Sequence, residues 1–350
     1  MKVLVTGATG LIGGHLVKLL NQRGIPVKAL VRESSNIDNL PKDKVEHCLG
    51  DIMNPASLIE AARDCDLILH AAGTFSYWGY DEATFMNEAR TGMENIVAAA
   101  VANKIKKLVF TSSSVTCGAM SKPQVLSEEA PGDFAEIPVY IKAKKLQEDV
   151  AFELGKKNKI KVIAACPTLT IGGPDSHLTE SNRMIVNYLK DPYKSTWPGG
   201  CNLVSVEDVA KAILLLAEKG KAGERYIIGS DNYEWKQVHS LISELTGMPG
   251  PFLTATHASA YLLSSFIELY SHLTNEHPSS TREQAKMVGK YYWYSSDKLK
   301  KLGFEPEPST EALIAAISWL VTTEHIPAAL RSLITLSDKI HSYRNQTSPL

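Results

Sequence analysis

Short apolar runs alternate with longer segments of helical periodicity through the first half of the chain. The apolar runs predict buried strands at Lys2–Thr6, Val27–Val31, Val45–Leu49, Leu67–Ala72, Leu108–Thr111 and Val162–Pro167. Apolar residues that recur every three or four positions predict helices at Leu11–Arg23, Pro55–Arg63, Glu82–Asn103 and Val139–Asn158. Strands and helices in alternation imply a parallel sheet covered on both faces. Ligands of such sheets bind beyond the carboxyl ends of the strands.

The alternation loosens after about residue 170, where loops rich in glycine and proline separate the remaining elements. Helices are predicted at Ser205–Lys219, Trp235–Thr246, Ala258–Leu273 and Thr310–Thr323, and a strand at Arg225–Ile228. The predicted fold is α/β, a Rossmann-type doubly wound parallel sheet over residues 1–170 that segments from 200–230 complete. A smaller, mostly helical substrate-binding part follows over 171–325. Leu330, Leu333, Ile334 and Ile340 stand at roughly helical intervals and predict a packed or partner-facing helical tail over 326–350.

The amino-acid composition does not point to any special class of protein. The chain has 350 residues, of which 44% are hydrophobic and 21% charged, and its formal net charge is −1. This is the profile of an ordinary soluble globular protein. A nucleic-acid surface would show a clustered basic excess, and the sequence has none. The five cysteines are odd in number and lack any C-x-x-C spacing, so neither a disulfide framework nor a metal site is predicted.

These features predict a cytoplasmic protein. The N-terminal apolar run is broken by glycines, which argues against a signal peptide. The most lipid-like stretch, Ala258–Leu273, contains Glu268 and His272 and is too short and polar to span a membrane. We therefore expect a small-molecule substrate and no integral membrane segment.

Three glycines spaced three apart, Gly7, Gly10 and Gly13, join the first strand to the first helix. Gly7 allows a tight turn, Gly10 lets backbone N–H groups approach a pyrophosphate, and Gly13 lets the helix lie against the strand. The triplet alone could be a mere turn, but its position between a strand and a helix favours a dinucleotide site. The intervening and following residues are expected to contact the same ligand: Thr9, Leu11 and Ile12.

The second strand ends with Val31-Arg32-Glu33, in the region where an NAD-selective protein usually places an acid. An arginine suits the 2′-phosphate of NADP, because guanidinium binds phosphate in a bidentate way. We therefore favour NADP (NADPH) over NAD; otherwise Arg32 is a solvated loop residue. The ends of the next two strands supply further expected cofactor contacts: Asp51, Ile52, Ala71, Ala72 and Gly73.

The fifth strand ends in hydroxyl-bearing residues, and Tyr140 and Lys144 follow on one face of a helix. A phenol has an ordinary pKa of about 10, and a nearby ammonium favours its phenolate form. Such a pair can exchange a proton with an alcohol oxygen while hydride moves at the adjacent carbon. Taken alone, the Tyr-x-x-x-Lys pattern fits an exposed helix with solvated lysines equally well.

The glycine triplet, the serine-ended strand and the Tyr/Lys pair occur together in an order that resembles the extended short-chain dehydrogenase/reductase superfamily over residues 1–325. The resemblance implies that Tyr140 is the general acid/base and that Lys144 holds the nicotinamide ribose and lowers the tyrosine pKa. It implies that Ser113 binds the substrate oxygen, with Ser114 and Thr116 as alternatives. Pro167 resembles the family's proline beside the nicotinamide.

Within the superfamily, the chain looks most like the dihydroflavonol-reductase-like branch that includes hopanoid-associated sugar epimerases. The segments that carry this likeness include His70-Ala-Ala-Gly73, Asn202–Ala210 and Gly223–Gly229. Relatives mostly reduce carbonyls or oxidise hydroxyl groups on apolar ring compounds, and homodimers are common among them. One departure is Ala89, which replaces an asparagine of the family pattern; Asn87 is the nearest substitute.

Aromatic residues and one histidine fall in segments expected to overhang the nicotinamide. They would suit a flat or lipid-like substrate, although each could instead be a packing residue. The favoured hypothesis is an NADP-dependent ketone reductase or alcohol dehydrogenase. The alternatives are an NAD-dependent nucleotide-sugar epimerase or dehydratase and a cofactor-sensing protein without turnover. The candidate substrate residues are Tyr77, Trp78, Ser114, His177 and Trp197, with Tyr188 considered beside them.

Overall fold

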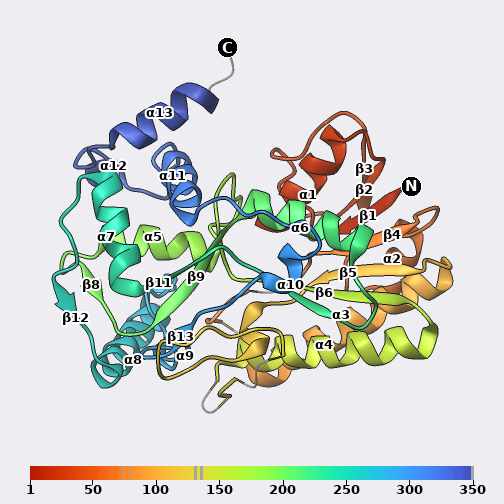
Figure 1. Cartoon of the computed structure of the whole chain (residues 1–350), viewed down its shortest axis with the longest axis horizontal. Helices are drawn as coiled ribbons and strands as arrows, with labels where there is room; N and C mark the ends of the chain where they lie inside the picture. Colours follow the sequence, from red (N-terminus) through yellow and green to blue (C-terminus); the bar gives the residue numbers. More distant parts are fainter. Residues whose placement is uncertain (74, 80, 130–131, 135–136, 348–350) are drawn as a thin grey trace.

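The computed structural model describes residues 1–73, 75–79, 81–129, 132–134 and 137–347 (Figure 1). Within these residues, the main sheet has seven strands, all parallel, in the order β3-β2-β1-β4-β5-β6-β10. The sheet is the doubly wound one that the alternating pattern predicts. Its strands are β1 (Val3–Thr6), β2 (Val27–Val31), β3 (Val45–Leu49), β4 (Leu67–His70), β5 (Lys107–Thr111), β6 (Lys161–Pro167) and β10 (Arg225–Ile228).

Helices cover both faces of this sheet, with separate apolar cores beneath them. On one face lie α1 (Leu11–Gln22) and α6 (Val206–Lys219), which contact each other. On the other face lie α2 (Pro55–Ala61), α3 (Glu82–Ala102) and α4 (Val139–Asn158). The central strands β1, β2 and β4 are buried along their whole length, which explains why most of their residues are apolar.

The strand order reverses at β1, which pairs with β2 on one side and with β4 on the other. Successive connections therefore leave β1 and β4 in opposite directions and open a crevice at their carboxyl ends. The glycine triplet follows β1, and Ala71 follows β4, so both lie at this crevice. The fold thus places the predicted cofactor residues at one sheet edge.

The second half of the chain contains a sheet that the sequence analysis did not predict. Only β10 of the 200–230 region joins the main sheet; β9 (Gly200–Ser205) is the centre of a separate sheet with mixed directions. Its partners are only two to four residues long, too short to show a periodic pattern. They are β7 (Leu169–Ile171), β11 (Asp231–Glu234) and β13 (Tyr291–Tyr292).

Helices pack on this second sheet and form a third apolar core around Leu203, Ile242 and Leu313. Figure 1 shows them at the end of the molecule away from the N-terminus, together with the short parallel pair β8 (Ser195–Thr196) and β12 (Leu253–Thr254). The remaining elements are η1 (Ser114–Cys117), α5 (Glu180–Lys190), α7 (Trp235–Thr246), α8 (His257–Thr274), α9 (Arg282–Ala285), α10 (Asp297–Lys300) and α11 (Ser309–Leu320).

The tail forms two helices rather than one continuous helix. α12 (Ala328–Arg331) and α13 (Asp338–Thr347) are separated by a turn, and α13 packs on α11. Ile340 is fully buried, whereas Leu333 is exposed. Pro327 begins α12, and the backbone at Thr335 and Ser337 hydrogen-bonds to the end of α7, which fixes the turn. Residues 348–350 of the predicted tail lie outside the described residues.

Among the helices of the described part, none combines the length and apolarity that crossing a bilayer requires. The same residues contain no group of three or more His, Cys, Asp or Glu side chains placed to hold a metal ion. Each of the five cysteines is a free thiol in the structure.

Candidate active site

The glycine turn after β1 forms a backbone cradle at the start of α1. Gly7 has a φ of +67°, and a Cβ there would lie 2.5 Å from the backbone nitrogen of Ala72. A Cβ on Gly13 would lie 2.0 Å from the carbonyl oxygen of Gly7. Gly10 is the N-cap of α1 and offers no side chain to the free N–H groups of the first turn. The positive end of α1 is therefore open to an anion such as a pyrophosphate.

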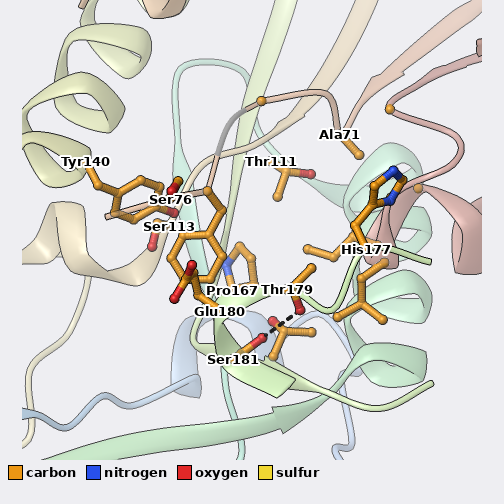
Figure 2. Close-up of a pocket in the computed structure, with 18 of the residues that line it drawn as sticks. Ala71, Ser76, Thr111, Ser113, Tyr140, Pro167, His177, Thr179, Glu180 and Ser181 are labelled. Atoms are coloured by element: carbon orange, nitrogen blue, oxygen red, sulfur yellow. Dashed lines mark hydrogen bonds between the residues drawn. The ribbon is translucent and has the colours of Figure 1, made fainter. Parts of the chain in front are cut away.

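A cavity of about 580 Å³ is lined by both this cradle and Tyr140 (Figure 2). Arg32 and Ser35, after β2, belong to its wall. The volume is within the usual range for cofactor sites. The structure brings all the residues predicted for the cofactor into this one cavity: Gly7, Thr9, Gly10, Leu11, Ile12, Gly13, Arg32, Asp51, Ile52, Ala71, Ala72, Gly73, Tyr140, Lys144 and Pro167.

Beyond Pro167, at the end of β6, lies a polar group that suits a nicotinamide. Thr168 lines the cavity and is 8% exposed, and its buried hydroxyl has no hydrogen-bond partner within the described residues. An unpaired buried hydroxyl is costly, so a ligand with a carboxamide would relieve that cost. The glycine cradle at one end and this hydroxyl at the other fit a nicotinamide dinucleotide.

The three predicted catalytic residues meet at the cavity wall. Tyr140 is in the first turn of α4, and its side chain lies beside that of Ser113, the residue before η1 (Figure 2). Lys144 lies one turn further along α4; its Nζ donates to the carbonyl oxygen of Thr111 at 3.0 Å and to Oε1 of Gln147 at 2.9 Å. The spacing of four residues on one helix explains why Tyr140 and Lys144 reach the same cavity.

The geometry separates Ser113 from its two alternatives. Thr116 donates its hydroxyl to the backbone oxygen of Ser113 and to Glu148, and it does not line the cavity. Ser114 lines the cavity but hydrogen-bonds with Tyr294 rather than with Tyr140. Ser113 is thus the serine that the structure places beside the tyrosine.

Burial dominates the acid–base properties of the pair. Desolvation raises the pKa of Tyr140 to about 12, and only the hydrogen bond with Ser113 acts in the opposite direction. Desolvation also lowers the pKa of Lys144 to about 8, although the charge of Glu148 acts to raise it. The Lys144 amine is held by Thr111 of β5 and by Gln147 of its own helix, and a lowering of the Tyr140 pKa by the lysine stays a prediction.

Asn87 does not take over the place of the asparagine that Ala89 replaces. Its side chain is exposed on α3 and accepts a hydrogen bond from Thr91, one turn further on. Ala89 itself packs against the apolar cluster that surrounds Tyr140. This part of the site is therefore apolar.

The candidate substrate residues divide into two groups. Tyr77 lines the cavity and packs edge-on against Tyr140 with ring centroids 5.7 Å apart; His177 lines the opposite side, near Ala71 (Figure 2). Trp78 and Trp197 are not in the cavity wall, and their expected role as substrate contacts is not supported. Trp78 packs on His272 of α8, and Trp197 packs on Trp235 and His239. Tyr188 is likewise buried, stacked on His239.

Two sets of cavity residues escaped the sequence analysis. One is aromatic or apolar and surrounds Tyr140: Phe75, Met287, Tyr292 and Tyr294. The other is polar and lies at the start of α5 and near it: Thr179, Glu180, Ser181, Arg183 and His277. The run Thr179-Glu180-Ser181 could have drawn attention as a cluster of hydroxyl and carboxyl groups in a predicted loop region. Tyr292 and His277 give no local signal, because their position depends on contacts far apart in the sequence.

The sheet, the cradle and the Ser/Tyr/Lys arrangement define an NAD(P)-dependent enzyme of the extended short-chain dehydrogenase/reductase type. Residues 3–229 match the family model described as "NAD dependent epimerase/dehydratase family", and the chain belongs to this family.

Relatives with known names support the same class. The chain is 28% identical over 321 residues to a protein named "Putative dihydroflavonol 4-reductase" from Synechocystis sp. (90% of this chain and 93% of the relative). It is 28% identical over 256 residues to "Sterol demethylase protein B" from Methylococcus capsulatus (72% and 77%). Among solved structures, that of gox2253 superposes with a TM-score of 0.81 at 28% identity and covers 93% of this chain and 99% of the other.

Proposed function

We propose that the protein is an NADP(H)-dependent oxidoreductase that interconverts a ketone and a secondary alcohol on a small apolar or ring-containing substrate. The observation that best supports this proposal is that Ser113 and Tyr140 lie beside each other in the wall of a partly aromatic cavity shared with the glycine cradle (Figure 2). A hydroxyl pair in a largely apolar site can bind one oxygen atom of a substrate from two sides.

Arg32 supports NADP as the cofactor. The residue follows β2 in the cavity wall, its side chain is exposed, and it takes part in no salt bridge with the described residues. Its guanidinium is therefore available to a 2′-phosphate, and the nearby Ser35 hydroxyl also lines the cavity. An acid that would hold the 2′-hydroxyl of NAD is missing at Val31 and Arg32.

Each residue of the site has a separate role in the proposed reaction. The cradle and α1 would hold the pyrophosphate, Lys144 the nicotinamide ribose, and Thr168 the carboxamide. When bound, the reduced cofactor supplies a hydride to the carbonyl carbon. Tyr140 donates its proton to the carbonyl oxygen, and Ser113 donates a hydrogen bond to the same oxygen. Because burial raises the pKa of Tyr140 to about 12, the phenol carries its proton at neutral pH, as a proton donor must.

The substrate class follows from the cavity wall around Tyr140. Phe75 and Tyr77 contact its ring, with centroids 4.9 Å and 5.7 Å away. Tyr292 and Met287 also line this end. Aromatic walls favour flat, apolar ligands. The name of the Methylococcus relative refers to sterols, which are polycyclic apolar compounds, and this agrees with the proposal. The proposal depends neither on the homodimer that the resemblance makes possible nor on the predicted cytoplasmic location.

A second candidate is an NAD-dependent nucleotide-sugar epimerase or dehydratase. It is favoured by the polar end of the cavity, where the Arg183 guanidinium lies 3.9 Å from Glu180 and its Nε has no hydrogen-bond partner in the described part. A cation beside a cavity suits the phosphates of a nucleotide sugar. The two candidates differ in how they use the cofactor, because an epimerase retains NAD through its cycle.

The first test is a comparison of the dissociation constants for NADPH and NADH. We expect NADPH to bind at least about tenfold more tightly, on the order of 1.4 kcal/mol. Arg32→Ser should remove this preference, whereas Arg23→Ser, a matched change at an exposed arginine after α1, should not. Equal binding of both cofactors, or NAD that copurifies with the protein, would move the assignment to the epimerase or dehydratase. A screen of apolar ring ketones with NADPH then tests the reaction itself.

A further inference from the structure

Helix α8 has its polar and apolar faces reversed relative to an ordinary surface helix. The side chains that it buries against the protein are Ser264, Glu268 and Ser271. The side chains that it exposes are large and apolar, each 59–78% exposed: Leu262, Leu263, Phe266, Leu269, Tyr270 and Leu273. At 100° per residue, the two sets lie on opposite sides of the helix.

Specific bonds hold the polar face inward. The Glu268 carboxylate accepts hydrogen bonds from the backbone nitrogen of Arg282 at 2.7 Å and from its guanidinium Nε. The hydroxyl of Ser264 lies 2.8 Å from that of Ser280. A carboxylate that is 5% exposed and paired in this way would be costly to release. The helix is therefore fixed with its apolar side outward.

Further exposed apolar side chains lie on the segments around β8 and β12, at the same end of the molecule as the helix. β12 is followed closely by α8, and Phe252, just before β12, is 89% exposed. The backbone nitrogen of Phe252 donates to the carbonyl oxygen of Lys194, whose neighbour Tyr193 is exposed in the turn before β8. Figure 1 shows α8, β8 and β12 at the same end of the molecule. Contiguous apolar patches larger than a few hundred Å² are rare on monomeric proteins and mark interaction sites.

We propose that α8 docks the protein on the surface of a phospholipid bilayer, with the helix lying in the membrane plane. The 18 residues of α8 contain Glu268 as their single Asp, Glu, Lys or Arg, and it faces the protein, so no charge has to enter the lipid. Leucine and phenylalanine on one side and tyrosines beside them are the composition of an interfacial helix.

A lipid surface fits this helix better than a second protein chain. Protein interfaces surround their apolar centre with polar groups and form about one hydrogen bond per 100–200 Å². The exposed side of α8 offers tyrosine hydroxyls and no other hydrogen-bonding side chain between Leu262 and Tyr270 except the partly buried Ser265. Because α8 has no exposed lysine or arginine, docking should work on zwitterionic lipid and resist salt.

Docking would also bring the bilayer close to the active site. His272 of α8 packs on Trp78 with ring centroids 4.6 Å apart, and the neighbouring Tyr77 lines the cavity. His277, just after the helix, lines the cavity and lies 3.3 Å from Glu180. Delivery of an apolar substrate from the membrane rests on the proposed function, whereas docking itself does not.

The test is cosedimentation of the full chain with sucrose-loaded phosphatidylcholine vesicles, without substrate or turnover. We expect the wild type to bind, and Leu262→Glu/Leu269→Glu to bind at least about tenfold more weakly. Val125→Glu/Leu333→Glu adds the same charge at two other exposed apolar positions and should bind like the wild type. Far-UV circular dichroism reports whether each variant is folded, and NADPH binding tests the proposed function separately.

A measurement on the unaltered protein accompanies the variants. Hydroxyl-radical footprinting should show that vesicles protect Phe266 and Tyr270. Failure of the wild type to bind vesicles overturns the proposal, as does equal binding by the α8 variant or unchanged labelling of Phe266 and Tyr270. If the wild type is a dimer that does not bind vesicles, and the α8 variant is a monomer, a second copy of the chain covers this surface instead.

Discussion

Glu148 carries a buried charge that is hydrogen-bonded to residues on either side of Ser113. Its carboxylate is 1% exposed and accepts hydrogen bonds from the hydroxyls of Ser112 and Thr116, the first of which adjoins Ser113. Arg225 of β10 approaches it from the other side at 3.1 Å. We predict that Glu148→Gln destabilises the protein and perturbs the site, although the side chain touches neither cofactor nor substrate.

The expected loss of unfolding free energy follows from the groups that Glu148 contacts. Breaking a fully buried ion pair by removing one charge costs roughly 3–5 kcal/mol. The Arg225 side chain is 32% exposed and can be rehydrated, and the amide oxygen of glutamine can still accept from the Ser112 and Thr116 hydroxyls, which both donate to Oε1. We therefore expect a loss of about 2 kcal/mol. Loss of the negative charge should also lower the pKa of Lys144 further, because Glu148 acts to raise it.

Urea unfolding gives the first readout, in a double-mutant cycle of Glu148→Gln with Arg225→Met. We expect a coupling energy of about 1–2 kcal/mol. Glu153→Gln, an exposed glutamate on the same helix, is the matched control and should change stability by less than about 0.5 kcal/mol. The alkaline limb of the reductase pH profile gives the second readout and should move to lower pH. A coupling energy near zero, or a pH limb that stays in place, would refute the reasoning.

Three further changes test other parts of the site. Tyr140→Phe should leave NADPH binding nearly intact and lower turnover by roughly 10²–10⁴-fold, because the proton donor is lost; full activity would remove the mechanism. Gly13→Ala should greatly weaken binding of both cofactors in a fluorescence titration, since its Cβ would meet the Gly7 carbonyl at 2.0 Å; unchanged affinity would show that the turn can move. Burial holds the pKa of His70 and of His239 at about 3. The unfolded chain takes up these protons below about pH 6.5, so unfolding free energy should fall as pH drops from there towards 3, by about 1.4 kcal/mol per pH unit for each histidine. Urea titrations between pH 7 and 4.5 should show a shallower slope for His239→Gln, and an identical slope would contradict the assignment.

The cofactor half of the site could be predicted from the sequence because its determinants are local. Gly7 and Gly13 are required by contacts within one strand–turn–helix unit. Tyr140 and Lys144 share a helix face through a spacing of four residues. Strand ends of a parallel sheet meet at one edge, so Pro167 and Ala71 could be placed near the cofactor before their contacts were known.

The substrate half could not be predicted in the same way. Tyr292 reaches the cavity because β13 pairs with β9, a contact between segments about ninety residues apart that no periodicity reveals. Trp197 and Tyr77 have the same character in the sequence, a large aromatic residue near a loop. One packs behind the wall on His239, and the other lines the cavity. The residue type indicates that an aromatic side chain is buried among apolar groups. Only the tertiary structure determines which residues it packs on.

The raised pKa of Tyr140 sets the cost of the proton transfer that the proposed reaction requires. Lifting the Tyr140 pKa to about 12 means that a phenolate at pH 7 costs about 7 kcal/mol, whereas the phenol is present without cost. Oxidation of an alcohol needs a base at this position, and reduction of a ketone needs an acid. The apolar surroundings that raise the pKa are the same Phe75 and Tyr77 rings that would bind a flat substrate. Binding of an apolar substrate and the raised Tyr140 pKa therefore have one physical origin in this site, and a polar substitution at Phe75 should weaken that binding and lower that pKa together.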